Sequence, residues 1–164
     1  MPALRELTMA PPDEQQANHP EPVRILLIED NDAHTKLILR AFHEDHLTNP
    51  VTCVRDGAEA LDYLFHRGQY QPPAASPRPH LILLDLKLPK VDGLEVLRQI
   101  KADPELHPIP VVVLTSSLAD RDMSEAYALG ANSYLAKPID FEKFHRMVQD
   151  LDFYWTVWNR PPHR

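Results

Sequence analysis

The sequence is poor in several residue types that often indicate a function. Its single cysteine, Cys53, excludes an internal disulfide, and its position in a short apolar run predicts a small buried hydrophobic side chain. There are only four glycines and neither a G-x-G-x-x-G nor a Walker motif, which argues against a nucleotide cofactor. The nine histidines are scattered without the paired spacing of zinc ligands.

Charge and hydropathy exclude two further classes. The formal net charge is −7 and no segment is dense in Lys and Arg, which argues against nucleic-acid binding. No apolar run approaches the length of a transmembrane helix, and the first residues lack an export signal. We therefore expect a cytoplasmic protein that binds neither nucleic acid nor membranes.

The hydrophobic pattern predicts five strands alternating with five helices. We expect strands at residues 24–28, 51–54, 81–84, 111–114 and 133–136. We expect helices at about 32–45, after 57, at about 94–103 and 120–129, and from 141 into an aromatic patch. This alternation predicts an α/β fold with a five-stranded parallel doubly wound sheet, the flavodoxin-like (βα)5 three-layer sandwich. It does not give the order of the strands.

The length of 164 residues suggests one domain with short extensions. Residues 1–22 are polar and proline-bearing, and we expect a flexible tail there. Residues 23–151 form the folded domain, and residues 152–164 an aromatic C-terminal extension. Residues 68–79 form a proline-rich loop that is long for a helix-to-strand connection. It is either a specificity feature or a tolerated surface insertion.

Four of the predicted strands run into polar or reactive side chains. These side chains are Glu29 and Asp30, then Asp85, then Thr115, then Lys137. In an open parallel sheet, ligands bind outside the carboxyl ends of the strands, where the strand order reverses. Each side chain alone has an ordinary explanation in a turn, but four sets at one edge predict a single functional site.

Three carboxylates gathered at one edge repel one another. A hard divalent cation would relieve this repulsion, and Mg²⁺ prefers oxygen ligands while keeping waters and phosphate oxygens in its shell. We therefore predict a Mg²⁺ site in which Asp30 and Asp85 are direct ligands.

These residues resemble the receiver domain of two-component response regulators over about residues 23–151. The motifs that match are Glu29-Asp30, Asp85 with Pro89 and Gly93 at the family's offsets, Thr115, Tyr134 and Lys137-Pro138. The long proline-rich loop and the aromatic end are similar to those of small single-domain regulators that pair with phytochrome-type sensor histidine kinases.

The resemblance implies a phosphoacceptor signalling module and not an enzyme, apart from self-catalysed phosphotransfer and autodephosphorylation. Asp85 would accept a phosphoryl group from a sensor histidine kinase. Lys137 and Thr115 would each bind a phosphoryl oxygen. Thr115 and Tyr134 would form a conformational switch.

The resemblance also completes the metal site. Glu29 would hold Mg²⁺ through a water, and the backbone carbonyl of Lys87 would be the remaining protein ligand. It further implies a cis peptide between Lys137 and Pro138. His34 follows the acid pair closely and either lines the rim of the site or, as we expect, is a solvated helix residue.

The expected output is protein contact, because no DNA-binding segment follows the last predicted helix. A downstream phosphotransfer or effector protein would receive the signal. Aromatic side chains at a chain end are typical of interface anchors. We therefore predict a homodimer through the last helix and the aromatic residues Phe153, Tyr154, Trp155 and Trp158.

Two other hypotheses fit a similar sheet. A Mg²⁺-dependent phosphohydrolase with an aspartyl-phosphate intermediate usually has a second Asp two residues after the nucleophile, where this chain has Lys87. An FMN protein would need a Ser/Thr/Gly phosphate loop after the first strand. The acidic run from Glu29 to Asp32 would repel phosphate instead.

Overall fold

Five parallel strands form one sheet at the centre of the molecule, in the order β2-β1-β3-β4-β5. The computed structural model describes residues 22–44 and 49–159. The strands are β1 (Ile25–Ile28), β2 (Val51–Val54), β3 (Leu81–Leu84), β4 (Val111–Thr115) and β5 (Ser133–Ala136). The chain crosses from β2 back past β1 to β3, so the strand order reverses between β1 and β3.

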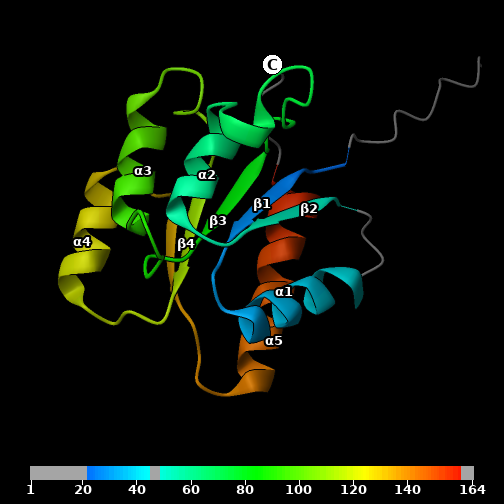
Figure 1. Cartoon of the computed structure of the whole chain (residues 1–164). Helices are drawn as coiled ribbons and strands as arrows, with labels where there is room; N and C mark the ends of the chain where they lie inside the picture. The colour runs from blue at the N-terminus through cyan, green and yellow to red at the C-terminus, as the bar shows by residue number, and fades with distance from the viewer. Residues whose placement is uncertain (1–21, 45–48, 160–164) are drawn as a thin grey trace, which may run out of the picture.

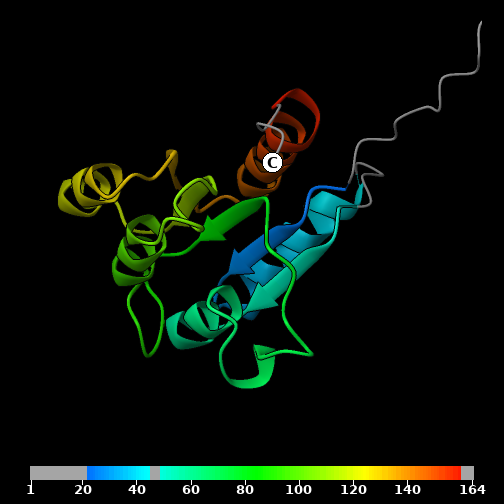
Figure 2. The same ribbon diagram turned by 90° about the horizontal axis from the view of Figure 1, so that it is seen from above.

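The helices cover both faces of this sheet. They are α1 (Asp32–Glu44), α2 (Gly57–Leu64), α3 (Gly93–Ala102), α4 (Asp120–Ala128) and α5 (Phe141–Phe153). Helices α1 and α5 pack on one face, and α2, α3 and α4 pack on the other (Figures 1 and 2). The predicted α/β three-layer sandwich is confirmed.

The central strands are buried on both faces, as their continuous apolar runs require. In β1, Ile25 and Leu27 belong to the core under α1 and α5, whereas Leu26 and Ile28 belong to the core under α2, α3 and α4. The edge strands β2 and β5 are only half-buried over most of their length. The core is therefore two apolar layers separated by β1, β3 and β4.

Aspartate side chains start three of the helices. Asp56 accepts a hydrogen bond from the third residue of α2, Asp92 from the second residue of α3, and Asp140 from the third residue of α5, at 2.8–2.9 Å. Helix α4 has no such side-chain cap, because Ala119 occupies its N-cap position. At its other end, Gly130 has a φ of +103°, which a glycine adopts without strain.

The long loop after α2 lies at the edge of the sheet where β3 begins, opposite Asp85 (Figure 1). It contains a short helical turn, Gly68–Tyr70. The Ser76 hydroxyl donates a 2.5 Å hydrogen bond to the Tyr63 carbonyl, and the Tyr63 hydroxyl donates one of 3.0 Å to the Pro77 carbonyl. The loop is packed against α2 and does not border the strand ends that carry the predicted site.

The two predicted extensions are described only in part. The flexible tail predicted for residues 1–22 lies outside the described residues except for Pro22, and so do residues 160–164 of the extension. Helix α5 runs without a break across residue 152 and continues as a single π-helical stretch, Tyr154–Trp158. In the described ranges, no helix combines the length and apolar character needed to cross a bilayer.

Candidate functional site

The predicted site residues meet at the carboxyl ends of the strands. The parallel register pairs Ile28 with Leu84, so the residues that follow these two strands lie side by side. The Asp85 N–H donates a 3.0 Å hydrogen bond to the Ile28 carbonyl, so the pairing of β1 with β3 continues to Asp85. Because β1 and β3 flank the reversal of strand order, the acids lie where an open α/β sheet forms its crevice.

The three predicted carboxylates form one cluster. An oxygen from each of Glu29, Asp30 and Asp85 lies within 4.8 Å of the others. Glu29 and Asp85 are buried and Asp30 is half-buried. Three carboxylate oxygens without nitrogen or sulfur suit a hard divalent cation such as Mg²⁺ or Mn²⁺, so the donor set fits the predicted metal.

Lys137 enters this cluster from the end of β5. Its buried ammonium donates hydrogen bonds to Glu29 Oε2 and, at 3.0 Å, to Asp85 Oδ2. Burial raises the pKa of Glu29 to about 7, although the Lys137 ammonium works in the opposite direction. The prediction of a cis Lys137–Pro138 peptide is wrong: within the described ranges, the cis peptide bond is the one joining Pro72 and Pro73. The long lysine side chain reaches both acids from a trans peptide.

His34 lies at the site, which agrees with the rim position and not with the solvated helix residue that we favoured. Its Nδ1 lies 3.1 Å from Lys137 Nζ and 3.8 Å from Glu29 Oε1, and its ring packs edge-on against Phe144. Burial and the Lys137 charge lower the pKa of His34. Because an ammonium can only donate hydrogen bonds, His34 Nδ1 is the acceptor. The available signal was its place in the first turn of the helix that follows the acid pair.

Thr115 and Tyr134 are connected through Ser117. The fully buried Thr115 accepts a hydrogen bond at Oγ1 from the Ser117 N–H, at 3.3 Å. The Tyr134 hydroxyl donates to the Ser117 carbonyl at 3.1 Å, and the Tyr134 ring is half-buried. The two predicted switch residues therefore share a partner that the sequence analysis did not identify.

Gly93 allows α3 to start against the strand end that carries Asp85. A Cβ at this position would lie 2.4 Å from the Asp85 carbonyl oxygen, so no other residue fits without moving the backbone. The loop between them brings the Lys87 N–H to 3.2 Å from Asp85 Oδ1. The role of the Lys87 carbonyl as a metal ligand stays a prediction.

Comparison with known proteins gives the family. The model of the response regulator receiver domain matches residues 25–149. The chain belongs to this family. The receiver is a signalling module, and the resemblance expected from Asp85, Thr115 and Lys137 is confirmed.

Two curated relatives extend over most of the chain. The probable methanogenesis regulatory protein FilR2 of Methanothrix harundinacea (strain 6Ac) is 50% identical over 87% of this chain and 89% of its own length. Response regulator Rcp1 of Synechocystis sp. (strain ATCC 27184 / PCC 6803 / Kazusa) is 42% identical over 82% of this chain and 89% of its own.

Solved structures agree with this assignment. The phosphorylated cyanobacterial phytochrome response regulator RcpA superposes with a TM-score of 0.82 at 41% identity, covering 87% of this chain and 99% of RcpA. The Mn²⁺-bound form of Rcp1 gives a TM-score of 0.82 at 40% identity, covering 87% of this chain and all of Rcp1. The predicted similarity to regulators of phytochrome-type kinases is confirmed.

Proposed function

We propose that residues 23–151 are a receiver that accepts a phosphoryl group on Asp85 from a sensor histidine kinase, with Mg²⁺. One observation carries this proposal. The buried Asp85 carboxylate contacts the Lys137 ammonium at 3.0 Å and lies in one cluster with Glu29 and Asp30. A carboxylate nucleophile, a cation site and a fixed ammonium are what phosphoryl transfer to an aspartate requires.

The transfer itself needs mainly positioning and charge neutralisation. An Asp85 oxygen forms a bond to phosphorus while the phosphorus–nitrogen bond of a phosphohistidine breaks, and the imidazole nitrogen keeps the electron pair. Asp30 and Asp85 directly, Glu29 through a water and the Lys87 carbonyl would hold Mg²⁺, which would supply charge neutralisation at the phosphoryl group.

Lys137 and Thr115 each bind a phosphoryl oxygen. The Lys137 ammonium contacts Asp85 Oδ2. A small displacement would therefore bring it to an oxygen of a phosphoryl group on Asp85. Thr115 lies in the same end of the sheet, and its hydroxyl proton is a donor for a second oxygen.

Rotation of the Thr115 hydroxyl toward the phosphoryl group also operates the Thr115 and Tyr134 switch. When the Thr115 hydroxyl turns toward the phosphoryl group, its 3.3 Å contact with the Ser117 N–H is given up. Because the Tyr134 hydroxyl is bound to the Ser117 carbonyl, the two rearrangements are coupled. The phosphoryl group shifts this equilibrium by as much as it favours one arrangement.

Exposed apolar side chains around the site support a protein partner. Leu118, Ile139 and Phe141 are 81%, 106% and 60% exposed, and each follows a site residue closely in the sequence. Apolar side chains at such exposure mark a contact surface when they gather beside a functional site. We assign this rim to the kinase, which takes its phosphoryl group from ATP, and therefore place the protein in the cytoplasm.

Similarity to Rcp1 and RcpA favours a kinase of the phytochrome type. A phosphohydrolase would need an acid/base aspartate two residues after Asp85, and this chain has Lys87 there. We therefore assign the chain no activity beyond phosphotransfer to itself and autodephosphorylation, and an output through a downstream phosphotransfer or effector protein.

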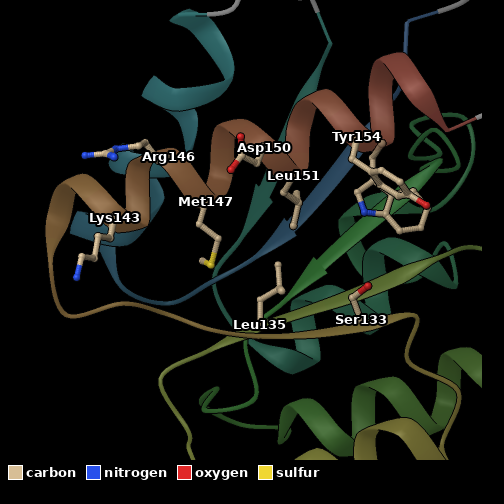
Figure 3. Close-up of a pocket in the computed structure, with 9 residues that line it drawn as sticks. Ser133, Leu135, Lys143, Arg146, Met147, Asp150, Leu151 and Tyr154 are labelled. Carbon is tan, nitrogen blue, oxygen red and sulfur yellow. The ribbon is translucent and has the colours of Figure 1, made fainter.

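We also propose that the chain forms a homodimer through α5 and the aromatic extension. A groove of about 500 Å³ lies between α5 and the edge strand β5, where Met147 and Leu151 point toward Leu135 and Tyr154 lies at one end (Figure 3). Just beyond it, Phe153, Tyr154, Val157 and Trp158 are 44–69% exposed. An open sheet edge beside exposed aromatic side chains suits a second copy of the same surface.

Phosphorylation with acetyl phosphate tests the phosphoacceptor proposal. With Mg²⁺, the protein should gain one acid-stable, base-labile phosphoryl group, and Asp85→Asn should abolish it. Asp92→Asn is the matched control, because asparagine also caps a helix and the position is outside the carboxylate cluster. Labelling that persists in Asp85→Asn would contradict the assignment.

The kinase type needs a separate measurement. Phosphotransfer rates from a phytochrome-type kinase and from a histidine kinase without a chromophore should be compared under identical conditions. We expect faster transfer from the phytochrome-type kinase. Equal or slower transfer would remove the phytochrome pairing and leave the phosphoacceptor role in place.

A further inference from the structure

Helix α4 is the least firmly anchored of the five helices in the described residues. Only Ala126 is buried, whereas each of the other four helices buries four or five residues. Its N-cap residue makes no side-chain hydrogen bond, and Leu118, Met123 and Tyr127 on and before it are exposed. A helix with so few buried contacts opens or shifts at low cost in free energy.

A hydrogen bond between Ser117 and Asp122 holds the start of α4 in place of a side-chain N-cap. The Ser117 hydroxyl donates a 2.5 Å hydrogen bond to Asp122 Oδ2, and Asp122 lies in the first turn of α4 with its side chain 18% exposed. Ser117 also binds Thr115 and Tyr134 through its backbone. One residue therefore contacts both switch residues and the start of the helix.

The same carboxylate oxygen faces a cation from the Asp85 loop. Lys87 Nζ lies 3.7 Å from Asp122 Oδ2, and the Lys87 side chain is 64% exposed. Lys87 follows Asp85 by two residues, and its N–H donates to Asp85 Oδ1. Asp122 therefore links the loop that carries the phosphorylation site to helix α4.

We propose that Lys87, Asp122 and Ser117 form a latch that a phosphoryl group on Asp85 releases. The proposal rests on the phosphoacceptor role given above. The phosphoryl oxygens bring a second strong acceptor for the Lys87 ammonium, which has a long, flexible stem and no other close partner than Asp122 among its ion pairs in the described residues. When Lys87 turns to the phosphoryl group, Asp122 loses its cation and the start of α4 loosens. Asp122 is thus a positioning residue that couples the site to α4, separately from the Thr115 hydroxyl.

Amide hydrogen exchange of α4 in matched variants tests this latch. Asp122→Asn keeps an oxygen that accepts from Ser117 but removes the attraction for Lys87. Asp120→Asn removes the same charge from the same helical turn and controls for the helix dipole. Before phosphorylation, the Met123 amide, which donates to the Ala119 carbonyl in the first turn of α4, should exchange about three- to fivefold faster in Asp122→Asn than in wild type, as loss of an exposed ion pair allows. Lys87→Met should behave like Asp122→Asn, and Asp120→Asn like wild type.

Phosphorylation with acetyl phosphate completes the test. It should speed exchange of the Met123 amide in wild type and Asp120→Asn, and change it little in Asp122→Asn. Identical exchange and an identical response in the two aspartate variants would overturn the latch while leaving Asp85 labelling intact. A wild-type protein that takes no label on Asp85 would instead overturn the phosphoacceptor role and the release step, and the comparison of unmodified variants would still decide whether the latch exists.

Discussion

Lys137 and the three carboxylates set the charge of the site. Lys137 contacts Glu29 and Asp85, and the fully ionised cluster of three acids and one ammonium keeps two negative charges. The raised pKa of Glu29 shows that burial opposes this charge. A bound divalent cation would balance the remainder, so cation binding and folding stability should be linked.

Mg²⁺ should therefore raise the melting temperature of the protein. At a concentration 100 times its dissociation constant, a ligand that binds only the folded state contributes about 2.7 kcal/mol. Asp30→Asn should remove most of this stabilisation, because it replaces a charged carboxylate of the cluster by a neutral amide. Glu142→Gln, which neutralises an exposed carboxylate on α5, is the control and should retain the shift. Calorimetry at several Mg²⁺ concentrations measures the effect, and an equal shift in both variants would argue against the assigned ligands.

Single residues also set the limits of the sequence analysis. Glu29, Asp30, Asp85 and Lys137 were found because each lies within two residues of the end of a predicted strand. Asp122 carries no such mark, because an aspartate in the first turn of a helix is expected from the helix dipole alone. Only its approach to Ser117 and Lys87 distinguishes it.

Strand β3 and helix α4 show two extremes of packing. All four residues of β3 are fully buried between the two helical layers, and β3 is the strand that delivers Asp85. Helix α4 buries one residue. The rigid element therefore carries the proposed acceptor, and the loosely packed element is available to move.

Paired leucine substitutions should report this difference. Leu83→Ala removes a fully buried side chain from the middle of β3 and should lower the free energy of unfolding by about 2–5 kcal/mol. Leu118→Ala, at an 81% exposed position before α4, should change it by less than about 0.5 kcal/mol. Urea unfolding measures both, and comparable losses would contradict the described packing.

The edge strand β2 gives a prediction for pH. Burial raises the pKa of the Cys53 thiol, so the folded chain keeps this proton to a higher pH than the unfolded chain does. Stability from this group should accordingly fall as the pH rises above about 9, where the unfolded thiol ionises first. Iodoacetamide at pH 8.5 should modify Cys53 slowly in the folded protein and rapidly in urea. Equally fast modification in both states would show an accessible thiolate.

The two ends of the sheet carry different features of the molecule. The carboxyl ends of the strands carry the proposed phosphoacceptor site and its exposed apolar rim. The opposite end carries the proline-rich loop, and the C-terminal aromatic residues extend toward the same end (Figure 1). The proposed kinase rim and the proposed dimer surface therefore share α5, with Phe141 of the rim at its start and the aromatic residues of the dimer surface at its end.

The proposed homodimer depends on the second of these surfaces. Combined Tyr154→Ala and Trp158→Ala, at positions 55% and 69% exposed, should weaken self-association without preventing Asp85 phosphorylation. Tyr127→Ala removes an aromatic side chain of 50% exposure from α4 and serves as the control. Sedimentation velocity over a range of concentrations compares the variants. An unaltered sedimentation profile in the double variant would remove this dimer surface.

Local patterns were sufficient to predict the strands and the residues at their ends. A short, largely apolar run has a strand's length, and the residue after it is at the sheet edge whatever the neighbouring strand is. The bounds of β2, β3 and β5 were therefore predicted to the residue, and the carboxylates, Thr115 and Lys137 were expected at one edge. The resemblance to the receiver family then supplied the predicted roles of these residues.

Packing decided what depends on residues distant in sequence. The place of His34 after the acid pair does not by itself give its contact with Lys137, and the strand order and the trans Lys137–Pro138 peptide have no local signal. Neither has the contact of Ser117 and Lys87 with Asp122, which brings together a strand end, a loop and a helix. Hydrophobic periodicity specifies which face of an element is buried, but not which neighbour covers it, and these contacts follow from the neighbour.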